Sequence, residues 1–289
     1  MTKKSVVITT SVLLGLILVF TILFGVVFRV RNINVVYADD FCYKTQIDGI
    51  LDVSNLSKND SLFTINRNKV VRNIERAYPY TRVEGVNISS FTSIKIKLSN
   101  RQPLYYIVEN AIYYILDEDC KVLEITNNKE LATKYILLTD VFSVSENTKA
   151  GEFLDSKYAK ICSNLYKALY TNAMLNIGDD IDQDGEPDKK YLERQDMYNL
   201  VKNIKFSVID ELDGKMDKLV MTSSYGVNIE IVEPQQNLDR KINMAFSALR
   251  EIIARDKQYS TNLSSSGSII VRYSYDENNN TILKCEYHA

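Results

Sequence analysis

One stretch of the sequence has residue types and spacing that suit a metal ion. Residues 180–188 read DIDQDGEPD, with carboxylates at alternate positions and a glycine that permits a tight turn. Carboxylate oxygens in this arrangement are the ligands that Ca²⁺ prefers. The sequence therefore predicts a possible calcium loop with Asp180, Asp182, Asp184 and Asp188 as ligands.

The same stretch has a second interpretation, in which it binds nothing. The twelfth position of an EF-hand count is Tyr191, where that motif requires a glutamate, although Glu193 is near. An acidic, polar insertion over residues 176–190 is the interpretation that the sequence favours, and the protein then needs no cofactor.

Other chemistry is poorly supported by the residues present. The only imidazole is His288, next to the end of the sequence, where chains tend to fray. A nucleophile, a base and an orienting group therefore have no evident place to meet, and we expect a protein that is not an enzyme.

The four cysteines leave two possibilities open. Cys42, Cys120, Cys162 and Cys285 are far apart in the sequence and show no C-x-x-C spacing, which argues against a zinc site. They can form up to two disulfides in any of three pairings, or remain small buried thiols.

Charge and glycine content exclude further classes. The net charge is −2, while residues 1–31 contain four basic residues and no acidic one, so the remainder is more acidic than the whole. Such a body has no basic stripe for nucleic acid. None of the ten glycines forms a phosphate-binding loop, and we expect no small-molecule substrate.

The elements that must position these residues begin with an uncharged run from Ser5 to Phe28. At about 1.5 Å per residue, a helix of this length crosses a hydrocarbon core of about 30 Å. A signal peptide has a shorter apolar region and an A-x-A-like site, which this run lacks. We therefore expect a transmembrane helix at 5–28 after a short cytoplasmic tail at 1–4. The protein would be a single-pass, type II protein of the plasma membrane, with its body outside the cytoplasm.

Two domains are expected after this helix, both of the α+β class. Residues 29–99 predict the order β-α-α-β-β, with a helix near 67–77 that ends before Pro79. Residues 100–289 predict short strands, a helix from about 155 to 170, a helix that begins at Asp239, and a C-terminal hairpin.

Four segments in this order resemble the FtsQ/DivIB family of bacterial cell-division proteins. They are VRNINVVYADDF, NKVVRNIERAYPYTRVEGVNISS continuing to Arg101 and Pro103, YYILDEDCKVLE, and GSIIVRYSY. The chain departs from the family pattern at Asn100, where glutamate is usual, at Cys120, where glycine is usual, and at Ile270, where aspartate is usual.

The resemblance implies a POTRA domain beside the membrane at 29–99 and a mixed "β domain" at 100–289. It also implies a scaffold of the divisome at the division septum, with two single-pass coiled-coil partners, FtsB/DivIC and FtsL, and a role in regulating septal peptidoglycan synthesis. In the family, the last strands bind FtsB/DivIC by strand addition.

Residues for this role follow from the resemblance. Arg272 and Tyr273 match the family's binding strand, and the terminal strand contributes Ile282, Leu283, Lys284 and Cys285 by position. Ordinary sheet positions, half-buried for Tyr273 and solvated for Arg272, are the alternative. For the whole chain, the alternative is a membrane-anchored wall enzyme or a Ca²⁺-dependent protein that binds the cell wall.

Overall fold

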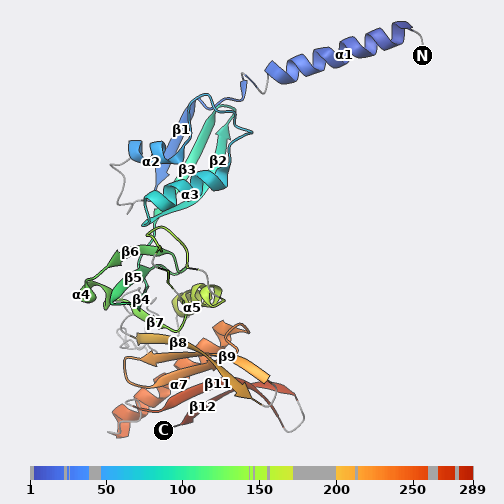
Figure 1. The fold of residues 1–289 in the computed structure, drawn as a ribbon. Coiled ribbons are helices and arrows are strands. Elements are labelled where there is room, and N and C mark those ends of the chain that lie inside the picture. The colour runs from blue at the N-terminus through green and yellow to red at the C-terminus, as the bar shows by residue number, and fades with distance from the viewer. Residues whose placement is uncertain are drawn as a thin grey trace, which may run out of the picture. The chain divides into compact units, whose positions relative to one another are not determined.

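The structure is a computed structural model, shown in Figure 1. It describes residues 3–22, 25, 27–38, 47–142, 144–145, 147–154, 157–171, 200–211, 214–259, 266–276 and 280–288. The chain forms two compact units, Met1–Arg101 and Gln102–Ala289. Helices and sheets occur in both, so the expected α+β class is confirmed.

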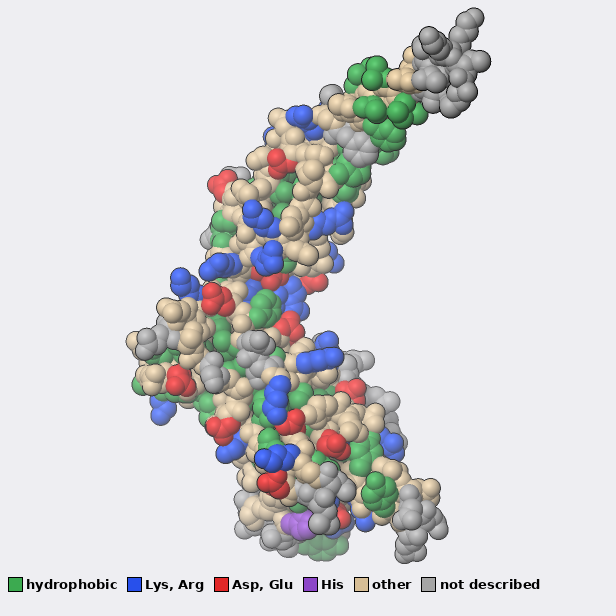
Figure 2. All heavy atoms as spheres, turned by 45° about the vertical axis from the view of Figure 1, so that its right-hand side comes forward, with side chains coloured by type: hydrophobic (Ala, Val, Ile, Leu, Met, Phe, Trp, Pro, Cys, Tyr) green, Lys and Arg blue, Asp and Glu red, His purple; other side chains and the backbone are tan. Residues whose placement is uncertain are grey.

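The first element is the helix α1, Lys3–Ile22. The large apolar side chains described along it, from Val12 to Ile22, are between 50% and 69% exposed. They follow one another around the whole helix, and Figure 2 shows hydrophobic side chains gathered over this segment. Within the described residues, no helix combines the length and the hydropathy of a membrane span.

The rest of this unit follows the order strand, helix, helix, strand, strand. The elements are β1 (Asn32–Tyr37), α2 (Ile47–Ser54), α3 (Arg67–Ala77), β2 (Thr81–Ser90) and β3 (Ser93–Asn100). The sheet order is β1-β3-β2, with β3 parallel to β1 and antiparallel to β2.

Alternation along β3 decides which of its faces is buried. Ile94, Ile96 and Leu98 are at most 1% exposed and form one core with Val70 and Ile74 of α3. The helix α3 begins at an asparagine cap, because the Asn66 Oδ1 atom accepts a hydrogen bond from the Lys69 backbone N–H at 3.0 Å.

A buried ion pair closes this first unit. The Arg101 guanidinium donates to both oxygens of Glu75 at 3.1 and 3.0 Å, and both side chains are less than 10% exposed. Glu75 also accepts from the Val83 N–H at 2.9 Å. Near the end of α3, Glu75 is buried whereas the apolar Ala77 is exposed.

The second unit is built on one large mixed sheet, with the strand order β12-β11-β10-β9-β8-β7-β4-β5-β6. Its strands are β4 (Tyr105–Glu109), β5 (Ile112–Leu116), β6 (Val122–Thr126), β7 (Ile136–Thr139), β8 (Val201–Glu211), β9 (Gly214–Ser223), β10 (Asn228–Val232), β11 (Ser268–Tyr275) and β12 (Thr281–His288). Its described helices are α4 (Lys129–Ala132), α5 (Ala159–Thr171) and α7 (Leu238–Tyr259).

The helix α7 packs on β10, β11 and β12 and also contacts α5 (Figure 1). The apolar residues buried on its inner face include Ile242, Ala245, Phe246, Leu249, Ile252 and Ile253. Strand residues that alternate toward this helix are buried. On the opposite side of the sheet, Lys218 of β9 pairs with Glu230 of β10 at 3.0 Å.

The turn between β5 and β6 explains why the family pattern has glycine at the position of Cys120. Cys120 has a φ of +61°, a left-handed conformation that glycine adopts without strain. Its side chain is fully buried. The pKa of the Cys120 thiol is well above its ordinary value. The main cause is a hydrogen bond with Cys162, and burial is the second cause. Cys120, Cys162 and Cys285 are free thiols, and Cys42 lies outside the described residues.

Removing the cation of the buried ion pair should destabilise the first unit. In the variant Arg101→Met, the Glu75 carboxylate loses its charged partner while it stays buried. Such a loss typically costs about 3–5 kcal/mol. We expect a decrease of this size in the free energy of unfolding of the first unit, measured by urea denaturation.

The control is an exposed arginine of comparable chemistry. Arg255 lies 3.9 Å from Glu251 on α7, and both side chains are more than 60% exposed. The variant Arg255→Met should change the free energy of unfolding by less than about 0.5 kcal/mol. Equal losses in the two variants would show that the burial of Glu75 is not what makes Arg101 important.

Candidate functional site

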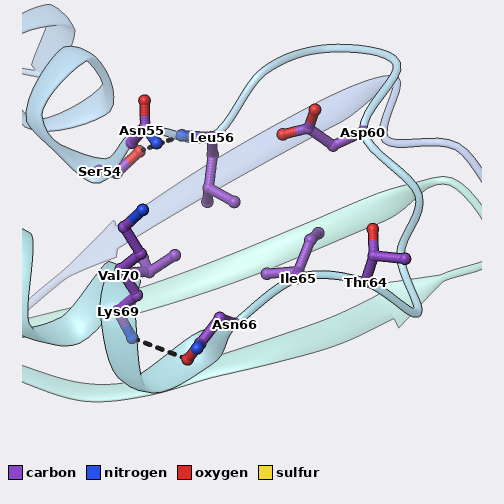
Figure 3. A pocket seen from close by; sticks show the side chains of 9 residues that line it. All are labelled: Ser54, Asn55, Leu56, Asp60, Thr64, Ile65, Asn66, Lys69 and Val70. Atoms are coloured by element: carbon purple, nitrogen blue, oxygen red, sulfur yellow. Dashed lines mark hydrogen bonds between the residues drawn. The ribbon is translucent and has the colours of Figure 1, made fainter.

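The first hollow to consider lies between the end of α2 and the start of α3 (Figure 3). It has a volume of about 280 Å³ and is lined by residues that include Leu56, Asp60 and Val70. Its polar groups already have local roles. The Ser54 hydroxyl bonds within its turn, Asp60 accepts from the Ser57 N–H, and Asn66 caps α3. We interpret this hollow as a consequence of the loop path.

The two edges of the large sheet differ in how they are covered. Along β6, the Val122 N–H donates to the Glu152 carbonyl at 2.8 Å, and the Gly151 N–H donates to the Val122 carbonyl at 2.7 Å. Backbone groups of residues next to Phe153 therefore pair with the first residue of β6 and cover the start of that edge. At the other edge, β12 pairs with β11 along its full length, and no further described strand follows it.

The hairpin geometry fixes which backbone groups of β12 face this open edge. The Asp276 N–H donates to the Asn280 carbonyl at 2.9 Å, and the register continues without a bulge. In an antiparallel ladder, successive residues alternate between facing the neighbouring strand and facing away. The outward backbone groups of β12 therefore belong to every second residue: Thr281, Leu283, Cys285 and Tyr287.

The register brings all six predicted binding residues together on this hairpin. Arg272 lies opposite Lys284, Tyr273 opposite Leu283, Ser274 opposite Ile282, and Val271 opposite Cys285. Because side chains alternate along a strand, the six divide between two faces. Tyr273, Leu283 and Cys285 are on the α7 side, and Arg272, Ile282 and Lys284 are on the other.

One side chain from α7 and one from the residue just before it hold Tyr273 in place. Its hydroxyl accepts a hydrogen bond from the Asn237 side-chain amide, and the Lys241 Nζ atom lies 4.7 Å from its ring centroid. Lys241 is fully buried and donates to the Val232 and Glu233 carbonyls at 2.7 and 2.8 Å. Tyr273 is therefore a half-buried residue held by Asn237 and Lys241.

Burial has a large effect on the charge of this lysine. It lowers the pKa of Lys241 from 10.5 to about 8, and the carboxylate of Glu233 opposes that shift. The ammonium group remains charged at neutral pH, where it can donate to both carbonyls and attract the Tyr273 ring.

Lys241 and Asn237 are part of the site that the motif comparison missed. One signal was present in the sequence, since Lys241 falls between Leu238 and Ala245 on the apolar face of the helix. A lysine at such a position needs hydrogen-bond acceptors when it is buried. The carbonyls that accept from it become apparent only once β10 and α7 are packed together.

The other face of the hairpin carries charge. Arg272 lies 3.6 Å from Glu286, with side chains 42% and 36% exposed, and Lys284 is exposed beside them. His288 lies 3.8 Å from Glu286, so the single imidazole sits on this surface. On the α7 side, Leu283, Cys285 and Tyr287 pack partly against the core, and the Cys285 thiol lies 3.9 Å from the Met244 carbonyl.

The predicted calcium ligands Asp180, Asp182, Asp184 and Asp188 lie outside the described residues, as does the whole insertion at 176–190. Among the residues that are described, no group of three or more metal-ligating side chains is found. The calcium loop thus stays a prediction, and a calorimetric titration of the chain with Ca²⁺ would test it.

Comparison with known proteins gives two relatives of the same name. The chain is 25% identical over 234 residues to the cell division protein DivIB of Clostridium tetani (strain Massachusetts / E88), covering 78% of this chain and 73% of that protein. It is 32% identical over 81 residues to the cell division protein DivIB of Clostridium acetobutylicum, covering 28% of this chain and 32% of that protein. No family model matches the chain.

The lowered pKa of Lys241 predicts how stability depends on pH. Between about pH 8 and 10.5 the unfolded chain binds more protons at this site than the folded chain. The free energy of unfolding therefore rises with pH over this window. We expect urea denaturation to show the wild-type protein gaining stability relative to Lys241→Met as the pH increases through the window.

The comparison with a variant is necessary because other groups act in the opposite direction. Burial raises the pKa values of Tyr37 and the Cys285 thiol, and both shifts make stability fall at high pH. Lys257→Met, which removes an exposed lysine from the same helix, is the control and should follow the wild type. If the free energy of unfolding of the wild type and of Lys241→Met changed with pH in parallel, the lowered pKa of Lys241 would be contradicted.

Proposed function

Because the chain belongs to the FtsQ/DivIB family of bacterial cell-division proteins, we propose that it is a non-enzymatic scaffold of the divisome. In this role it binds other membrane-anchored division proteins and thereby regulates septal peptidoglycan synthesis. The protein acts through its surfaces, with neither a small-molecule substrate nor nucleic acid as its partner.

The observation that best supports a binding role is the open edge of β12. Its eight residues pair regularly with β11, and every second one presents its backbone N–H and C=O groups on the outer side. Such an edge binds an extended segment by adding a strand to the sheet. The proposed partner at this edge is the FtsB/DivIC-like protein, together with an FtsL-like protein in the same complex.

Side chains on the two faces give this edge its selectivity. On the α7 side, a bound strand would extend the partly buried apolar border of Leu283, Cys285 and Tyr287. On the other side it would meet the charges of Arg272, Lys284 and Glu286. A partner segment that alternates apolar and charged residues fits both surroundings.

The membrane anchor and the POTRA identity of residues 29–99 are part of the same proposal. The uncharged run from Ser5 to Phe28, and the exposed apolar side chains all around α1, favour a helix within a bilayer. The order β-α-α-β-β after it is the order implied for a POTRA domain. The protein would then be a single-pass, type II protein of the plasma membrane at the division septum.

Localisation tests the function as a whole. A fluorescent protein fused to the N-terminus of the full chain should concentrate at midcell in dividing cells, because the other divisome proteins assemble there. The readout is the ratio of midcell to lateral fluorescence. An even distribution around the envelope would contradict the scaffold role and favour a protein that binds the cell wall.

A proline in the edge strand tests the binding mode. Leu283→Pro removes an outward-facing N–H, which an edge strand tolerates because no β11 bond is lost. We expect this variant to keep its fold by circular dichroism but to lose co-purification with the FtsB/DivIC-like partner.

Two further variants serve as controls for the proline. Leu283→Ala keeps the N–H and should retain more binding than the proline variant. Lys284→Pro removes an N–H that faces β11 and should destabilise the hairpin itself. Wild-type binding by Leu283→Pro would rule out strand addition at this part of the edge.

A further inference from the structure

Three phenylalanines meet at one end of the first unit. The ring centroid of Phe28 lies 5.1 Å from that of Phe63 and 5.7 Å from that of Phe91, both in edge-to-face orientations. Phe63 belongs to the loop before α3, and Phe91 belongs to the connection between β2 and β3. We refer to Phe28, Phe63 and Phe91 as the Phe cluster.

Backbone hydrogen bonds attach both loops to the segment that contains Phe28. The Leu62 N–H donates to the Phe28 carbonyl at 3.0 Å, and the Val30 N–H donates to the Asp60 carbonyl at 2.9 Å. On the other side, the Arg31 N–H donates to the Thr92 carbonyl at 2.7 Å. The positions of the two phenylalanine-bearing loops are therefore fixed relative to Phe28.

Two members of the Phe cluster are exposed to an extent unusual for large aromatic side chains in a folded body. Phe63 is 56% exposed, and Phe91 is 73% exposed, the largest value among the large apolar side chains described. Phe91 also occupies a two-residue hairpin connection, where glycine, asparagine and aspartate are preferred. Packing inside the described body therefore does not explain why phenylalanine occurs at positions 63 and 91. An apolar environment outside the protein does explain it.

The position of Phe28 in the sequence indicates which environment that is. Phe28 is the last residue of the uncharged run that begins at Ser5. If this run lies in a bilayer, its end lies near the headgroup region, and any ring within 6 Å of Phe28 lies there too. The two other rings of the Phe cluster would therefore lie at the same depth as the end of the anchor.

We propose that the Phe cluster inserts into the interfacial region of the lipid bilayer, so that Phe63 and Phe91 are a second membrane contact of the first unit. This inference rests on the membrane anchor proposed above. Exposed Arg29 and Arg31 lie within three residues of Phe28, where they can pair with lipid phosphate groups at the same level. The contact limits how freely the first unit turns about the end of its anchor.

The absence of tryptophan from the chain allows a direct test. Phe63→Trp and Phe91→Trp each place a single indole in the full-length protein, which is reconstituted in vesicles of phosphatidylcholine and phosphatidylglycerol. We expect the tryptophan emission of each reconstituted variant to lie at shorter wavelength than that of the same variant unfolded in urea without detergent. We also expect it to be quenched by lipids brominated near the headgroup more than by lipids brominated near the bilayer centre.

Tyr80→Trp is the matched control in the same unit. Tyr80 precedes β2 and Phe91 follows it, so at about 3.3 Å per residue the two lie roughly 30 Å apart. Its emission should be insensitive to brominated lipids. Because all three variants keep the anchor, vesicle flotation measures the anchor independently of fluorescence.

The outcomes separate this inference from the proposed function. If the variants float with vesicles but Phe63→Trp and Phe91→Trp are not quenched, the contact is wrong and the anchor stands. A blue-shifted emission without quenching would mean that protein covers the Phe cluster, which also overturns lipid insertion. If the variants do not float, the anchor and the contact are both wrong.

Discussion

The packing of α7 under the end of the large sheet is the interaction on which the open edge depends. Strands β10 and β11 are parallel, and a parallel pair needs a crossover connection, which is usually a helix. Here α7 supplies that crossover and buries its apolar face on the strands it connects. Each large aliphatic side chain buried in this way contributes about 1.5–3 kcal/mol. Without α7, β11 and β12 would keep only the short pairing of β11 with β10.

Much of this arrangement can be predicted from the sequence, because it follows from local periodicity. Ile242, Leu249 and Ile253 recur at helical spacing, and the two terminal strands flank a polar loop. Both features depend on residues a few positions apart. The motif at Arg272 and Tyr273 locates the strand that lies next to the edge.

The residues that periodicity does not predict are those with distant partners. Glu75 and Arg101 lie 26 positions apart, and neither is apolar, so no local pattern marks them as buried. Lys241 can be buried because two carbonyls at the end of β10 accept hydrogen bonds from its ammonium group. In each case the favourable energy comes from a hydrogen-bond geometry that exists only after packing. Cys120 is a further residue that periodicity does not predict. Its left-handed backbone accounts for the glycine of the family pattern but not for the cysteine.

The edge strand also shows why register controls any segment that binds there. The outward backbone groups belong to Leu283, Cys285 and their alternate neighbours, whose side chains point to the α7 side. A bound strand continues the same alternation, so its residues face the apolar border and the charged surface in turn. A slip of one residue would exchange the two sets and bring charged side chains against Leu283 and Tyr287. Backbone pairing alone accepts many sequences, and the difference between the two faces is therefore what makes the edge selective.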